Sequence, residues 1–210
     1  MTENQKKRLA VLVSGSGTNL QAIIDAIKSK ELEKTEITLV ISNKKEAFAL
    51  ERIKKEKIEG FFFNPADFKT NLDYDKEIIK WLNQKKIDLI ILAGYTKILT
   101  TSFINSFQNK IINIHPSLLP SFGGKGMYGQ KVHEAVLKSG ITESGCTVHF
   151  VTEEIDRGPI IAQRKVPVLK GDTIDTLSKR VLTEEHKLLI DSIKKVLFEE
   201  PVALLNKTSA

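Results

Sequence analysis

The chain has 210 residues, of which 41% are hydrophobic and 28% are charged. This composition excludes collagenous, low-complexity and disordered chains, and no apolar run approaches the roughly 20 residues that span a bilayer. The formal charge of +6 comes from lysines interleaved with acidic residues. That pattern indicates solvated helix faces, and the positive charge is compatible with small anionic ligands. The sequence lacks the interleaved basic and aromatic residues that are typical of nucleic-acid-binding proteins.

The start of the chain and its cysteine content lead us to expect a cytoplasmic protein. Residues 1–8 are basic and polar, and an apolar segment begins directly after them, which leaves no room for the apolar region of a signal peptide. Cys146 is the single cysteine and forms no internal disulfide, as is typical of a reducing compartment.

Short apolar runs alternate with amphipathic segments in the first half of the chain. The predicted strands are 9–13, 37–41, 60–63, 88–92 and 110–114, and the predicted helices are 19–27, 47–55 and 73–84. The continuous apolar character of 88–92 indicates a strand covered on both faces. The alternation predicts an α/β fold, with a doubly wound, mostly parallel, Rossmann-like sheet and helices on both faces.

The pattern changes after Pro116. The sequence predicts a Gly- and Pro-rich loop at 118–127, and then a helix, two strands, a long helix and a polar tail: 130–138, 147–151, 160–168, 172–198 and 199–210. Pro167 favours an edge position for the second of these strands, which we expect to be an antiparallel addition to the sheet. We detect no repeat or linker, so the prediction is one domain over residues 1–210.

The segment 15–19, Gly-Ser-Gly-Thr-Asn, connects the first predicted strand to the first helix. Backbone N–H groups at a helix N-terminus favour an anion. A dinucleotide fingerprint would need glycine at Leu20 and an acid after the second strand, and both are missing, as is the lysine of a Walker motif. Two interpretations stay open, a phosphate site for a mononucleotide-like ligand and a tight structural turn.

Asn113 and His115 lie two residues apart near the end of a predicted internal strand, so they share one face of the sheet. Ligands of open parallel sheets bind at this end of the strands. An amide can stabilise an oxyanion while a histidine moves a proton, which is the equipment of acyl transfer. The alternative is a histidine that only packs in the core.

Asp156 lies in an acidic turn that a Gly-Pro pair ends. Such an acid is either merely solvated or enters the same strand-end region as a base or as a group that orients the histidine. A thiol nucleophile is not expected, because nothing near Cys146 would lower its pKa. The four histidines are scattered, so no metal site is predicted.

Five segments together resemble the phosphoribosylglycinamide formyltransferases, folate-dependent formyltransferases of purine biosynthesis. They are residues 13–23 (VSGSGTNLQAI), 92–95 (LAGY), 113–120 (NIHPSLLP), 147–151 (TVHFV) and 156–161 (DRGPII). The resemblance covers nearly the whole chain. The third segment is specific to folate-dependent formyl transfer, and the first indicates the branch that uses glycinamide ribonucleotide.

The resemblance implies formyl transfer from 10-formyltetrahydrofolate, as co-substrate, to the amino group of glycinamide ribonucleotide. Asn113 and His115 would stabilise the oxyanion, with His115 as proton donor to the leaving nitrogen. Asp156 would take the amine proton, through water, or hold His115 charged. Residues 1–112 would form a nucleotide-binding half and residues 113–210 a catalytic, folate-binding half.

The resemblance also implies the ligand contacts. The ribonucleotide would contact Gly17, Thr18, Asn19 and Glu185. The folate would contact Asn113 and two loops, one with Thr96, Lys97, Ile98 and Leu99, the other with Thr152, Glu153, Glu154, Ile155 and Asp156. The expected state is a monomer or weak homodimer with small-molecule substrates and with no metal, nucleic acid or membrane.

At two places the sequence departs from the family pattern, and no family role is assigned to the residues there. Asn71 stands where many members have an arginine near the folate, and the loop 121–128 is longer and richer in glycine, without an assigned role. Three alternatives share some of the features: a methionyl-tRNA formyltransferase, a formyltetrahydrofolate deformylase, and a nucleotide-binding module without catalysis. The first two would need an additional C-terminal or N-terminal domain, and the third leaves Asn113, His115 and Asp156 unexplained.

Overall fold

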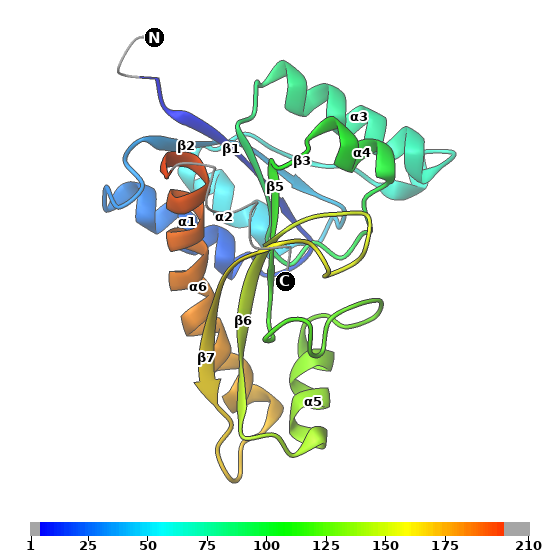
Figure 1. Ribbon diagram of the computed structural model, residues 1–210. Helices are drawn as coiled ribbons and strands as arrows, with labels where there is room; N and C mark the ends of the chain where they lie inside the picture. The colour runs from blue at the N-terminus through cyan, green and yellow to red at the C-terminus, as the bar shows by residue number, and fades with distance from the viewer. Residues whose placement is uncertain (1–4, 200–210) are drawn as a thin grey trace. The chain divides into compact units, whose positions relative to one another are not determined.

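The computed structural model describes residues 5–199, so the predicted polar tail from residue 200 and the first four residues of the basic start lie outside the described part. The chain divides into two compact units, Met1–Ile112 and Asn113–Ala210 (Figure 1). Within the described residues the hydrogen-bonded strand order is β3-β2-β1-β4-β5-β6-β7, and β5 (Ile111–His115) crosses the division.

The first unit is built on parallel strands. β1 (Lys7–Val13) pairs with β2 (Thr35–Ser42) and β4 (Leu89–Leu92), and β2 pairs with β3 (Gly60–Phe62). The helices are α1 (Thr18–Lys28), α2 (Phe48–Glu56), α3 (Asn71–Gln84) and α4 (Thr101–Ser106). α1 lies beside α2 and α3 beside α4, and the two pairs cover opposite faces of the strands (Figure 1).

The burial of the central strands explains why they are apolar throughout. Residues 9–13 of β1 are fully buried, and every residue of β4 is buried. Strands that are covered on both faces need no polar alternation. This arrangement brings the segments that follow β1, β2 and β4 to the carboxyl edge of the same parallel group.

The second unit combines the end of β5 with α5 (Gln130–Ser139), β6 (Glu143–Phe150), β7 (Ile160–Pro167) and α6 (Ile174–Phe198). β6 and β7 are antiparallel, and α6 lies along both (Figure 1). β7 is the edge strand, as predicted, and it ends at Pro167, one residue before the predicted end. The predicted α/β class with a mostly parallel sheet and an antiparallel C-terminal addition is confirmed.

Sequence patterning missed two short elements and the start of one strand. α4 has six residues, too few to show helical periodicity, and begins where Thr100 accepts a hydrogen bond from the Phe103 N–H. The 3₁₀ turn Pro65–Asp67 was also missed. β6 begins at Glu143, four residues before the predicted start. The prediction missed these residues because the first three are polar or glycine and show no apolar run. At Gly145 a Cβ atom would lie 2.1 Å from the Arg164 carbonyl oxygen, so this polar-looking strand needs glycine.

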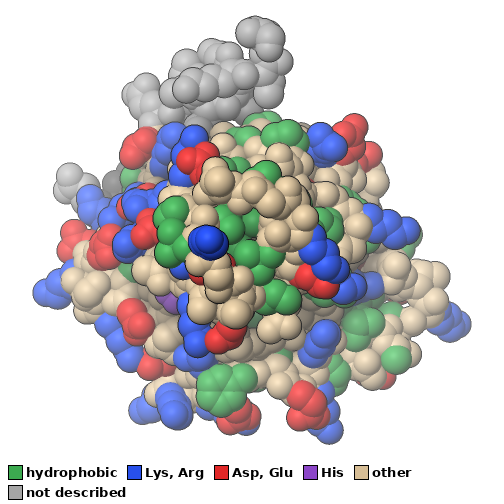
Figure 2. Space-filling model, turned by 90° about the horizontal axis from the view of Figure 1, so that it is seen from below, with side chains coloured by type: hydrophobic (Ala, Val, Ile, Leu, Met, Phe, Trp, Pro, Cys, Tyr) green, Lys and Arg blue, Asp and Glu red, His purple; other side chains and the backbone are tan. Residues whose placement is uncertain are grey.

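Charged side chains are mixed over the surface. Figure 2 shows lysines and arginines interspersed with aspartates and glutamates on one face of the molecule. On the helices many of these form pairs one turn apart, such as Lys138 with Glu134 and Lys179 with Asp175. The interleaved charges of the sequence therefore include solvated helix faces, as predicted.

Candidate active site

Three predicted catalytic side chains belong to the second unit, and the structure brings them together. Asn113 and His115 lie in the last three residues of β5, and Asp156 lies in the loop 151–159 between β6 and β7. Oδ2 of Asp156 is 3.6 Å from Nδ1 of His115. The side chains of His115 and Asp156 are only 5% and 11% exposed, so their mutual charge is weakly screened.

The hydrogen bonds of His115 define its protonation. Nε2 lies 2.9 Å from the Phe122 carbonyl oxygen, and because a carbonyl only accepts, Nε2 carries a hydrogen. Nδ1, on the Asp156 side, is then the nitrogen that gains or loses the proton. Burial lowers the pKa of His115, against the opposing effects of the Asp156 charge and the Phe122 hydrogen bond. The neutral ring with its open Nδ1 is therefore favoured at neutral pH.

His149 is a fourth member of the cluster and was not among the predicted site residues. Its Nδ1 donates to the Phe150 carbonyl oxygen at 2.8 Å, so Nε2 is the acceptor for the Asn113 side-chain amide at 3.1 Å. The same Nε2 lies 3.6 Å from Oδ1 of Asp156. His149 thus fixes which end of the Asn113 amide carries the N–H groups and leaves the second of its two hydrogens for another acceptor.

Asp156 is held by the backbone as well as by the two histidines. Its Oδ2 accepts a hydrogen bond from the Gly124 N–H at 2.9 Å, and its own φ is +56°, a left-handed conformation that is rare outside glycine. Burial raises the pKa of Asp156, but the interactions with His149, His115 and Gly124 outweigh it, so the pKa lies below its ordinary value. The carboxylate is therefore ionised, and strain at such a position is typical of functional sites.

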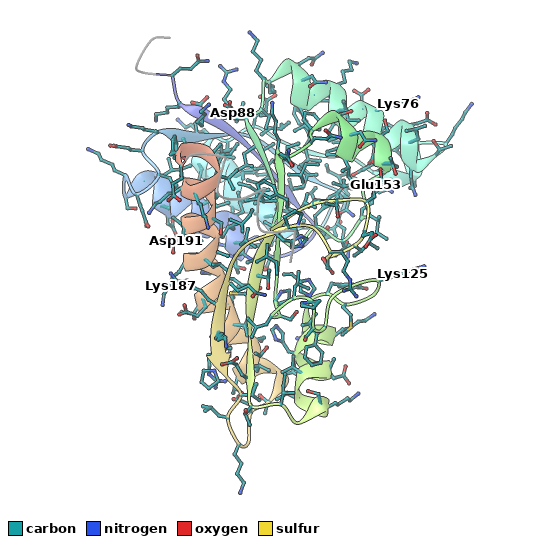
Figure 3. All side chains as sticks on the ribbon, viewed as in Figure 1. Lys76, Asp88, Lys125, Glu153, Lys187 and Asp191 are labelled. Carbon is teal, nitrogen blue, oxygen red and sulfur yellow. The ribbon has the colours of Figure 1, made fainter. Side chains whose placement is uncertain are left out.

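The loop 116–129 approaches this cluster through buried hydrogen bonds. Thr147 on β6 donates to the Ser117 carbonyl at 2.6 Å and accepts from the Leu119 N–H at 3.0 Å and from Gln163 at 2.9 Å. These bonds hold the loop whose Phe122 and Gly124 contact His115 and Asp156. Lys125 of this loop and Glu153 of the loop 151–159 lie on one side of β6, and α6 lies on the other (Figure 3).

In the first unit, the predicted phosphate loop is a close-packed turn ahead of α1. Gly17 has φ +70°, and a Cβ there would lie 2.6 Å from the Ala49 Cβ, so no other residue fits without a shift. α2 holds the loop further: the Ala49 N–H donates to the Gly15 carbonyl at 3.2 Å, and Arg52 Nε donates to the Ser16 carbonyl at 2.8 Å. Gly17, Thr18 and Asn19 therefore present a fixed helix start.

The predicted folate loop 96–99 follows β4 in the first unit. Both the N–H and the hydroxyl of Thr96 bond to the Ser14 hydroxyl, at 2.9 and 3.2 Å. Lys97 bonds to Asn71 Oδ1 at 2.5 Å and lies over the Tyr74 ring. Ile98 is exposed and Leu99 is buried. Asn71 therefore contacts the cation of this loop.

The remaining predicted site residues are in the second unit. Thr152, Glu153, Glu154 and Ile155 form the turn that leads to Asp156, in which the Thr152 hydroxyl donates to the Glu154 carbonyl at 3.2 Å. Glu185 is a buried residue of α6. The site assignments remain predictions.

Two expectations about other residues concern the thiol and a metal. Cys146 is buried in β6, and burial raises the pKa of its thiol to about 12, which makes it a poor nucleophile. Among residues 5–199 no group of three or more histidines, cysteines or acids is placed to hold a metal ion. In the same range, no helix has the length and apolar character needed to cross a membrane.

Comparison with known proteins defines the family. The model of the formyl transferase family matches residues 7–193, and the chain therefore belongs to this family. The chain is 44% identical to the phosphoribosylglycinamide formyltransferase of Haemophilus influenzae over 87% of its own length and 83% of that protein. It is 41% identical to the chloroplastic phosphoribosylglycinamide formyltransferase of Vigna unguiculata over 94% of its own length.

A solved structure agrees with the sequence relatives. The glycinamide ribonucleotide transformylase 1 of Geobacillus kaustophilus is 39% identical, with a TM-score of 0.86 over 92% of this chain and 100% of that one. The chain spans 63% of the Vigna protein and less than a fifth of the animal relatives it matches. The predicted family is confirmed.

Proposed function

We propose that this protein transfers the formyl group of 10-formyltetrahydrofolate to the amino group of N1-(5-phospho-D-ribosyl)glycinamide. The products are the N2-formyl compound and tetrahydrofolate, and the reaction belongs to de novo purine biosynthesis. One observation carries the proposal: Asn113, His115 and Asp156 converge in a buried cluster that can stabilise an oxyanion and move a proton. The names of the relatives at 41% and 44% identity support the choice of substrates.

The cluster supports a defined sequence of steps. The amine nitrogen attacks the formyl carbon, a C–N bond forms, and the carbonyl electrons move to oxygen, where the second amide hydrogen of Asn113 stabilises them. The ionised Asp156 takes the amine proton, directly or through water. It passes this proton to Nδ1 of His115, and Nδ1 gives it to the leaving nitrogen, while the Nε2 hydrogen stays on the Phe122 carbonyl. The oxyanion electrons then re-form the carbonyl as the C–N bond to tetrahydrofolate breaks.

The two ligands are assigned to separate loops. The ribonucleotide phosphate would bind the helix start at Gly17, Thr18 and Asn19, with Glu185 as a further contact to this ligand. The folate would contact the loop Thr96–Leu99, the loop Thr152–Asp156 and Asn113. The rigid, glycine-dependent turn at Gly17 supports the first assignment, and the exposed apolar side chain of Ile98 supports the second.

The proposal extends to the setting of the reaction. We assign the protein to the cytoplasm, as a monomer or weak homodimer that needs no metal. The single buried Cys146 supports a reducing compartment.

A spectrophotometric assay with purified protein and a 10-formylfolate donor tests the proposal. The deacylated folate should appear only when glycinamide ribonucleotide is present. Equal product without the ribonucleotide would instead identify a formyltetrahydrofolate deformylase, which the same cluster could serve with water as the nucleophile. Absence of product in both cases would contradict catalysis and leave a nucleotide-binding module.

A further inference from the structure

The Ser14 hydroxyl is a junction between three strand ends of the first unit. Ser14 directly follows β1, Asn43 directly follows β2, and Thr96 lies four residues after β4. These strands are neighbours in the sheet, in the order β2-β1-β4. Ser14 also immediately precedes the phosphate loop 15–19, so one residue joins that loop to the loop 96–99.

All the hydrogen-bonding capacity of this hydroxyl is used inside the protein. Ser14 donates to Oδ1 of Asn43 at 2.6 Å and accepts from the N–H and the hydroxyl of Thr96 at 2.9 and 3.2 Å. A hydroxyl has one hydrogen and two lone pairs, so none is left for a ligand. The residue is 5% exposed, which keeps water from replacing these bonds.

The opposite end of the loop 96–99 is held independently. Asp75 on α3 is fully buried, and its Oδ2 accepts from the Thr100 N–H at 2.7 Å. Tyr95, ahead of the loop, shares a hydrogen bond of 3.0 Å with Tyr74. The end at Thr100 and the residue ahead of the loop are thus held by α3, and the backbone N–H of Thr96 itself is held by Ser14.

We propose that Ser14 is a positioning residue that sets the folate loop Thr96–Leu99 in its binding conformation and in register with the ribonucleotide loop. It touches neither substrate; it acts through the backbone N–H of Thr96. This inference rests on the proposed function, because the loop has been assigned to the formyl donor there. Loss of the hydroxyl leaves the Thr96 N–H without its acceptor and lets the loop shift, so donor binding weakens while the chemical step is kept.

Steady-state kinetics of Ser14→Ala test the proposal. The KM for the formyl donor should rise about tenfold, while kcat and the KM for the ribonucleotide stay within about twofold of the wild-type values. The matched control is Thr35→Val. Thr35 is also fully buried and donates one hydrogen bond, to the Leu32 carbonyl at 2.7 Å, but it lies at the start of β2 and away from the strand ends that carry the loops. The control should lose thermal stability without a change in either KM.

Hydrogen exchange of the ligand-free protein gives a readout that does not depend on activity. Peptides covering 95–100 should exchange faster in Ser14→Ala than in the wild type, and peptides of β1 should not. If Ser14→Ala does not fold, Asn43→Ala is the second variant, because it removes the acceptor that orients the Ser14 hydrogen. It should raise the donor KM in the same direction by a smaller factor.

The outcomes separate the two proposals. An active wild type with an unchanged donor KM in Ser14→Ala overturns the role of Ser14, as does equal weakening of both substrates. An inactive wild type overturns the proposed function, and hydrogen exchange alone then decides whether Ser14 positions the loop.

Discussion

Oδ2 of Asp156 lies 3.6 Å from Nδ1 of His115, while Nε2 of the same ring donates to the Phe122 carbonyl. The two nitrogens of one imidazole therefore face a carboxylate on one side and a loop carbonyl on the other. A proton that enters at Nδ1 makes an ion pair with Asp156, while the Nε2 hydrogen stays on the Phe122 carbonyl. This geometry holds the ring in one orientation, with Nδ1 on the carboxylate side.

Replacement of Asp156 by asparagine should abolish most of the turnover. Asp156→Asn keeps the size of the side chain but removes the base, so kcat should fall by about 10²- to 10⁴-fold, the range of one positioned acid or base. Ribonucleotide affinity, measured by calorimetry, should be unchanged. Glu134→Gln, an exposed acid on α5, is the control and should keep full activity. Turnover that survives in Asp156→Asn would contradict the assigned role.

The loop that we assign to the ribonucleotide should tolerate alanine at one glycine and not at another. Gly17→Ala places a Cβ against Ala49 at a φ of +70°, whereas a Cβ at Gly15 meets no atom within 4 Å. Gly17→Ala should therefore weaken ribonucleotide binding at least tenfold, since both the steric conflict and the positive φ displace the helix start. Gly15→Ala should weaken it far less. Calorimetric titration of both variants checks this, and equal losses would show that Gly17 has no special part.

Most helices and strands, and the pair Asn113 and His115 at the end of a strand, were predictable because they depend on local periodicity. The two-residue spacing of Asn113 and His115 was sufficient to place both on one face of β5, at the end of a strand. Asp156 could be proposed but not positioned, since its approach to His115 depends on a left-handed turn and on the Gly124 N–H, which is distant in sequence. The position of such a turn is set by tertiary contacts.

His149 shows the limit of this reasoning. The sequence did carry a sign of its role, because Thr147 and His149 are two residues apart and so share one face of a predicted strand. In the structure both contact segments of the site. The sequence pattern does not indicate which strands are neighbours, and only the adjacency of β5 and β6 turns His149 toward Asn113. α4 was missed for the opposite reason, since its six residues carry too little pattern to detect.

His149 should affect both the rate and its pH dependence. His149→Leu removes the acceptor that orients the Asn113 amide, so kcat should fall about tenfold or more. It also removes one interaction that lowers the pKa of Asp156, so that pKa should rise. The acid limb of the kcat/KM profile, which reports the free enzyme, should move to higher pH. His149→Gln, which keeps a polar group, should show smaller effects. An unshifted acid limb in His149→Leu would contradict this account.

His133 should make the protein less stable in acid. It is buried in α5, and burial, with a further contribution from the charge of His115, lowers its pKa to about 4. The unfolded chain, with a pKa of about 6.5, binds a proton first, so folding stability falls as the pH drops from 6.5 to 4 and then levels off. A shift of this size corresponds to about 3 kcal/mol in the free energy of unfolding.

Urea unfolding of wild type and His133→Leu between pH 8 and pH 4 measures this contribution. Leucine fills a similar volume and does not titrate, so the variant should lose about 3 kcal/mol less than the wild type between pH 6.5 and pH 4. Above pH 7, His133 is neutral in both the folded and the unfolded protein. The plots of unfolding free energy against pH for wild type and variant should therefore run parallel there, which serves as the internal control. Curves that stay parallel down to pH 4 would mean that His133 accepts its proton in the folded protein as readily as in the unfolded chain.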